Sequence, residues 1–169
     1  MDERWRRVIN DIAEKVRGLM ELSDKPDVDM DDVVKRLGGT ISRFSDYSSY
    51  ERIIKGEGLN FKIEINENNA ETRQRFSIAH ELGHLFLHMK FPSSEWEAIA
   101  VGEMHRRTPG MYSITEEEAS EFAGAFLMPA ELFRKAIKQH SEDRDKIAKH
   151  FNVSADAVAR RGRNLGIWK

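Results

Sequence analysis

The sequence predicts an α+β fold in which helices precede and follow one small sheet. Three patterns indicate this order. Apolar residues recur at helical spacing over residues 3–22, residues 60–66 alternate between apolar and polar, and helical spacing returns from residue 70 onward. A chain of 169 residues is long enough to bury a hydrophobic core.

Each element follows from a local pattern. Acidic residues that can cap a helix precede residues 30–39, which predict a short helix ended by glycine. Residues 40–68 predict two or three strands around a Gly-x-Gly turn, and residues 90–113, with two prolines, predict a long loop holding a short helical piece. Further helices are expected at 70–89, 115–127, 130–140 and 143–164, the last broken near Asn152. We divide the chain into residues 1–140 and a C-terminal helical segment, 141–169.

Composition restricts the possible functions. The chain has no cysteine, which excludes disulfides, thiolate metal sites and a cysteine nucleophile. No apolar stretch is long enough to span a bilayer, and the N-terminus lacks a signal-peptide pattern, so we expect a cytoplasmic protein without membrane contact. The net charge is −2, although residues 134–169 hold ten basic and four acidic side chains. We interpret this basic segment as a solvated helical surface rather than a nucleic-acid site.

The motif that carries chemistry is His80-Glu81-x-x-His84, within an apolar helical segment. Residues four apart leave the same face of a helix one turn apart, so both imidazoles can meet one zinc ion. Glu81 lies about 100° around the helix from His80 and can act on a water as general base without binding the metal. The other interpretation is two surface histidines on an amphipathic helix.

His88 extends the same face but is not expected to be a ligand. A straight helix separates it from His80 by about 12 Å along the axis, which is too far for one ion. We expect a histidine at the helix C-terminus, where the dipole favours it.

The third ligand is expected from residues 115–127. Glu116 lies nearest the buried face of that predicted helix, and Ser120 lies one turn further on, where it could hydrogen-bond near Glu116. Thr115 is the expected N-cap, with Glu118 completing a capping box and Glu117 facing water. Three protein ligands leave an open position for water, which is typical of catalytic sites.

Other parts of a catalytic site are less defined by the residues. His105, Arg106 and Tyr112 are candidates for the donor that stabilises an oxyanion. Residues 60–66 could form a sheet edge that holds an extended substrate by strand addition.

Three segments together resemble the ImmA/IrrE family of zinc metallopeptidases, in the family's order. They are RQRFSIAHELGHLFLH, EEEASEFAGAFLMP and IAKHFNVSADAVARRGRNLG, and the resemblance covers about residues 28–166. It implies a thermolysin-like zincin core with N-terminal helices, a three-stranded mixed or antiparallel sheet packed on the HExxH helix, and a C-terminal helical part. It implies zinc held by His80, His84 and Glu116, with Glu81 as base. Two features depart from the family: Ser120 stands where Asn is usual, and the loop between Met89 and Ser113 matches no known pattern.

The resemblance also implies a partner. Family members act on helix-turn-helix repressors, so the expected substrate is an Xre-type repressor or antitoxin encoded nearby. Two alternatives remain. Residues 145–166 resemble a helix-turn-helix with Arg160, Arg161 and Arg163 on its second helix, which would suit a metal-binding regulator that contacts DNA, although we expect no direct DNA binding. The protein could also bind a repressor without cleaving it.

Overall fold

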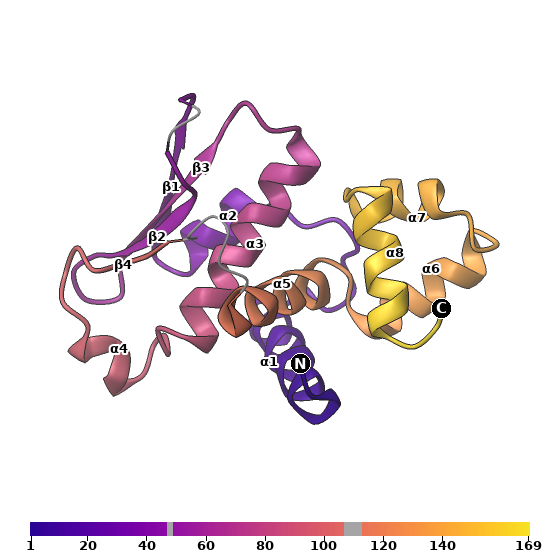
Figure 1. Ribbon diagram of the computed structural model, residues 1–169, viewed down its shortest axis with the longest axis horizontal. Coiled ribbons are helices and arrows are strands. Elements are labelled where there is room, and N and C mark those ends of the chain that lie inside the picture. The colour runs from indigo at the N-terminus through magenta and orange to yellow at the C-terminus, as the bar shows by residue number, and fades with distance from the viewer. Residues whose placement is uncertain (47–48, 107–112) are drawn as a thin grey trace.

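The computed structural model describes residues 1–46, 49–106 and 113–169, and it confirms the α+β class. The sheet and the C-terminal helices lie at opposite ends of the molecule, with α3 and α5 between them (Figure 1). The elements are α1 (Glu3–Leu19), α2 (Met30–Arg36), β1 (Gly39–Phe44), β2 (Arg52–Lys55), β3 (Phe61–Asn66), α3 (Glu71–Leu87), α4 (Ser94–Ala98), β4 (Met104–Arg106), α5 (Ile114–Leu127), α6 (Ala130–Gln139), α7 (Arg144–Phe151) and α8 (Ala155–Asn164).

The sheet is mixed, with strand order β1-β3-β2-β4. β1 runs parallel to β3, whereas β2 runs antiparallel to both β3 and β4. The three expected strands are therefore confirmed, and the segment predicted as a loop adds a short fourth strand. The prediction that residues 60–66 form an edge is wrong, because β1 occupies the side of β3 that the β2–β3 hairpin leaves open. Among the described strands, β1 and β4 form the edges.

The central strand β3 faces helix α3 with its apolar side. Phe61, Ile63 and Ile65 are buried, while the residues between them are more exposed. Helix α3 in turn buries Ile78 and Leu82, so the segment from His80 to His84 lies on a helix anchored against the sheet. No helix in the described part of the chain is both long and apolar enough to cross a bilayer.

Helices α3 and α5 cross at an unusually short separation, and Gly83 allows it. A Cβ atom at Gly83 would lie 2.9 Å from both the Cα and the carbonyl oxygen of Ala119. Atoms of that kind cannot approach so closely, so the backbones would have to separate. The small residues at this crossing bring the α3 histidines within reach of the first turn of α5.

The helical segment at the C-terminus breaks where the sequence predicts. Helix α7 ends at Asn152, which has the left-handed φ of 53°, and the Ser154 side chain caps α8. The pair has the helix–turn–helix order that the sequence pattern indicates.

Arg161 does not lie on an exposed face of α8, contrary to the DNA-contact alternative. It is buried, and its guanidinium donates to the Glu121 carboxylate at 3.2 Å and to the Met128 carbonyl at 2.9 Å. Burial lowers the pKa of Arg161 to about 10, so the side chain is still a cation at neutral pH. Glu121 also accepts from Asn10 of α1 and Asn164 of α8, so this carboxylate links α5 to both ends of the chain.

Gly83→Ala should destabilise the protein by about 1–3 kcal/mol, because the added methyl group forces α3 away from α5. In an ordinary helix the same change stabilises by about 1 kcal/mol. Gly124→Ala in α5 is the matched control, since a Cβ there meets only the Arg161 Cδ at 3.9 Å. Urea unfolding measures both variants, and equal or increased stability of Gly83→Ala would contradict the close crossing.

Arg161→Ala should destabilise by about 3 kcal/mol, because it removes one partner of a buried ion pair. Arg163→Ala, an exposed arginine on the same helix, should change stability by less than about 0.5 kcal/mol. Urea midpoints of the two variants give the comparison. Similar midpoints would show that the Glu121 contact contributes little.

Candidate metal centre

Helix α3 places two imidazoles side by side, as the motif predicts. His80 and His84 are one turn apart, and their Nε2 atoms lie 3.1 Å from each other. The His84 residue is 1% exposed and the His80 residue is 8% exposed. Two imidazole nitrogens that converge in a buried place can supply two of the ligands of a tetrahedral metal site.

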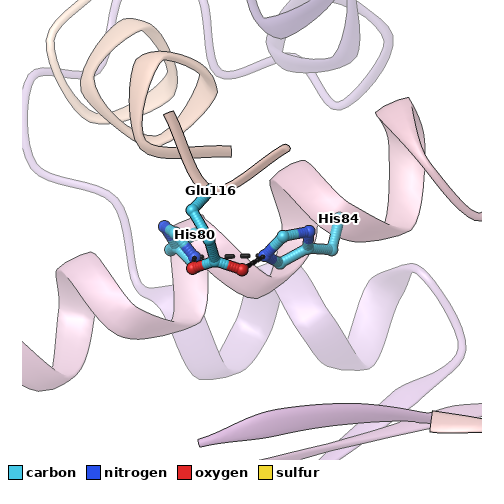
Figure 2. A group of neighbouring side chains, drawn as sticks. All are labelled: His80, His84 and Glu116. Atoms are coloured by element: carbon cyan, nitrogen blue, oxygen red, sulfur yellow. Dashed lines mark hydrogen bonds and ion pairs between the residues drawn. The ribbon is translucent and has the colours of Figure 1, made fainter. Parts of the chain in front are cut away.

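Helix α5 supplies the carboxylate. One Glu116 oxygen lies 3.2 Å from His80 Nε2 and the other lies 3.2 Å from His84 Nε2 (Figure 2). The N-cap lies two residues earlier than predicted, because it is Ser113 rather than Thr115, and the Ser113 hydroxyl accepts the Glu116 N–H at 3.3 Å. Glu116 is therefore in the first turn, and its side chain points back to α3.

The three side chains fit one metal ion. Their ligand atoms all lie within 4.8 Å of one another, and the donor set of two imidazole nitrogens and one carboxylate oxygen is one that zinc prefers. Hydrogen bonds with His80 and His84 hold the pKa of Glu116 well below its usual range, although burial opposes this. Glu116 is thus ionised, the form that binds a cation, throughout the physiological pH range.

Glu81 follows His80 on α3 and is 2% exposed. It is not a member of the group of ligand atoms that could hold a metal ion. Together with His80, Ser120 and Arg160 it lines a cavity of about 100 Å³. Such a cavity has room for water beside the carboxylate.

Ser120 supports a different ligand from the one expected. Its hydroxyl is hydrogen-bonded to His80 Nδ1 at 3.2 Å, so it supports an imidazole rather than Glu116. The positions of Glu116 and Ser120 along α5 do not by themselves show which α3 side chain lies opposite each of them.

Glu118 and His88 have partners that sequence reasoning missed. Glu118 was expected to cap α5, but its carboxylate instead contacts His88 Nε2 at 3.0 Å and the Trp5 indole at 2.6 Å. His88 lies at the C-terminal end of α3, as predicted, and its Nδ1 lies 2.8 Å from His84 Nδ1. The ligand face of His84 is its Nε2 edge, so His88 lies on the opposite edge of that ring. The sequence signal for this contact is the spacing of four residues between His84 and His88, which places the two rings one helical turn apart.

The proposed oxyanion donors cannot be placed. Tyr112 lies outside the described residues, and the side chains of His105 and Arg106 lie outside them as well, although their backbone forms part of β4.

Comparisons with known proteins give a fold and a family. The fold resembles that of a Mycobacterium tuberculosis transcriptional regulator, with a TM-score of 0.61 and 18% sequence identity. The match covers 94% of this chain and 50% of that protein, so the chain spans half of its length. No curated protein matches the chain. The Peptidase_M78 profile, described as the IrrE N-terminal-like domain, matches residues 29–162. The chain therefore belongs to the IrrE N-terminal-like family.

Proposed function

We propose that the protein is a zinc-dependent metallopeptidase with a regulatory role. The observation that carries the proposal is the convergence of His80, His84 and Glu116 from two helices, with the buried acid Glu81 directly beside His80. A site with only structural zinc has no need of that acid. Membership of the Peptidase_M78 family supports the same assignment.

Different residues of the chain would have different roles in hydrolysis. His80, His84 and Glu116 would hold the ion and leave one position open. Zinc bound there supplies Lewis acidity toward a scissile carbonyl and lowers the pKa of a water molecule. Glu81 accepts a proton from the attacking water and returns it to the leaving amine. The Ser120 hydroxyl orients the His80 ring by holding its Nδ1.

We further propose that the substrate is a helix-turn-helix repressor or antitoxin of the Xre type, encoded nearby and encountered in the cytoplasm. The family resemblance supports this choice. We expect one or a few protein targets of this kind rather than broad specificity.

A non-catalytic regulator is the second candidate. It would use the same metal site but act by binding a repressor or DNA through its C-terminal helices. The helix–turn–helix order of α7 and α8, with Arg160 and Arg163 exposed, favours it. The buried position of Arg161 weakens the DNA version, because one of the three arginines counted for DNA contact is inside the protein.

Glu81→Gln should abolish cleavage while metal binding is preserved, since the amide keeps the shape of the side chain but cannot accept a proton. The assay is coexpression with the repressor encoded beside the gene, followed by mass spectrometry of the fragments. Glu95→Gln, an exposed acid on α4, is the control and should cleave normally. Undiminished fragments from Glu81→Gln would contradict the role of Glu81, and intact repressor that copurifies with the wild type would favour the binding candidate.

Zinc should stabilise the wild-type protein and bind with a stoichiometry of one. At a zinc concentration about 1,000 times the dissociation constant, the expected gain is about 4 kcal/mol, and a chelator should reverse it. Glu116→Ala and His84→Ala should lose most of this stabilisation. His140→Ala should keep it, because His140 lies on the far side of the fold beside His150. Thermal unfolding with and without zinc, together with metal analysis, gives the result.

A further inference from the structure

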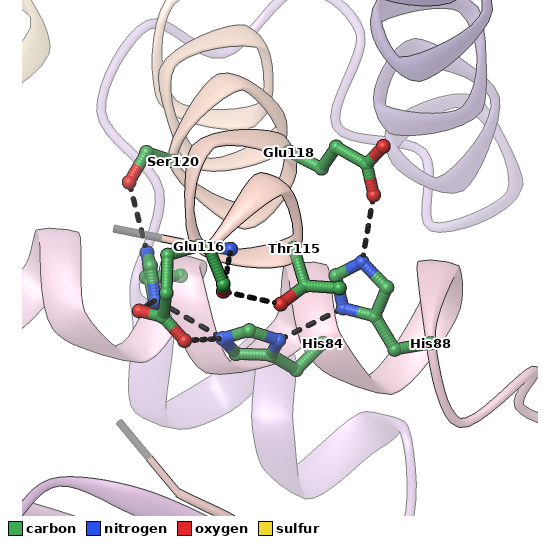
Figure 3. Close-up of polar contacts among 8 residues, drawn as sticks. His84, His88, Thr115, Glu116, Glu118 and Ser120 are labelled. Carbon is green, nitrogen blue, oxygen red and sulfur yellow. Dashed lines mark hydrogen bonds and ion pairs between the residues drawn. The ribbon is translucent and has the colours of Figure 1, made fainter. Parts of the chain in front are cut away.

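A line of polar side chains extends behind His84, away from the ligand group. His84 Nδ1 lies 2.8 Å from His88 Nδ1, and His88 Nε2 lies 3.0 Å from a Glu118 oxygen. The other Glu118 oxygen accepts the Trp5 indole N–H at 2.6 Å. Figure 3 shows Glu118, His88 and His84 in one continuous series of contacts, with Glu116 on the other edge of the His84 ring.

The direction of each hydrogen bond follows from the chemistry at the two ends. When His84 binds a metal through Nε2, that nitrogen carries no proton, so in the metal-bound protein the ring proton is on Nδ1. His84 Nδ1 then donates to His88 Nδ1, which accepts. A carboxylate can only accept, so His88 Nε2 donates to Glu118. With its proton on Nε2, the His88 ring satisfies both of these neighbours.

The hydrogen bonds that hold the two ligand histidines therefore differ. His80 is held by the hydroxyl of Ser120, whereas His84 is held through a second imidazole by a carboxylate. The His88 and Glu118 side chains are 14% and 13% exposed, so water competes weakly for these contacts. Trp5 belongs to α1, which lies outside the region matched by the family profile, residues 29–162.

We propose that His88 and Glu118 are positioning residues for the metal ligand His84, and that Trp5 of the N-terminal helix fixes Glu118 in place. This inference rests on the proposed metal site. By accepting the Nδ1 proton, His88 selects the tautomer with a free Nε2 and restrains the rotation of the ring. Glu118 accepts the Nε2 proton of His88, so it selects the His88 tautomer with a free Nδ1 and restrains the rotation of that ring. Helix α1 thus affects metal binding through Glu118 and His88, which hold the ligand His84.

The test is the zinc dissociation constant of purified full-length variants, measured by competition with a chromophoric chelator. His88→Phe keeps a ring but has no acceptor, and it should weaken zinc binding by about 10–100-fold. His88→Asn can offer an oxygen near the position of Nδ1 and should recover part of that loss. Glu118→Gln and Trp5→Phe act one and two steps further away, and their losses should be smaller in that order. Glu117→Gln, in the same turn of α5, is the matched control and should bind zinc as the wild type does.

A second measurement separates positioning from general stability. Urea unfolding of the metal-free variants should show similar midpoints, and the visible absorption spectrum of the cobalt-substituted His88→Phe protein should differ from that of the wild type. Zinc affinities within twofold of the wild type in every variant would overturn the inference alone. A loss of affinity that His88→Asn does not recover, and that matches a loss of metal-free stability, would also overturn it. A wild-type protein that binds no zinc would instead overturn the proposed function.

Discussion

The close crossing of α3 and α5 is the constraint on which the candidate site depends. Gly83 removes the side chain that would keep the helices apart, and Ala119 presents its backbone at that point. His80 and His84 lie on either side of Gly83 along α3, and Glu116 lies one turn before Ala119 on α5. Gly83, which permits the close approach of the helices, therefore lies between the two histidines whose contact with Glu116 depends on that approach. A wider crossing would leave the two imidazoles without a carboxylate partner.

The other elements hold that crossing in place. The sheet supports α3 through the apolar side of β3, and α1 packs along α5. Glu121 receives donors from both α1 and α8, so a single buried carboxylate ties the two ends of the chain to the helix that carries Glu116. A buried carboxylate is costly unless it has partners, and two amides and the Arg161 guanidinium donate to Glu121 here. The C-terminal helices are therefore part of the support of α5.

The first turn of α5 shows how one short segment serves several purposes. Ser113 caps the helix, Glu116 faces the imidazoles, and Glu118 faces His88 and Trp5. Each acid points in a different direction because successive residues on a helix are turned by about 100°. The local rule explains why the directions differ, but the partner met in each direction is supplied by another element.

The sequence by itself determined what depends on near neighbours along the chain. The helices, the strands β1 to β3, the break at Asn152 and the pairing of His80 with His84 follow from spacing and capping within a few residues, whereas the short strand β4 does not. The choice of Glu116 also followed, because the inner face of α5 is visible in its apolar pattern. Only the tertiary structure decided that β3 is central, that Ser120 supports His80, that Glu118 reaches His88, and that Arg161 is buried. These outcomes depend on which distant segment packs opposite each residue, and that information is not present in the spacing of residues along one helix or strand.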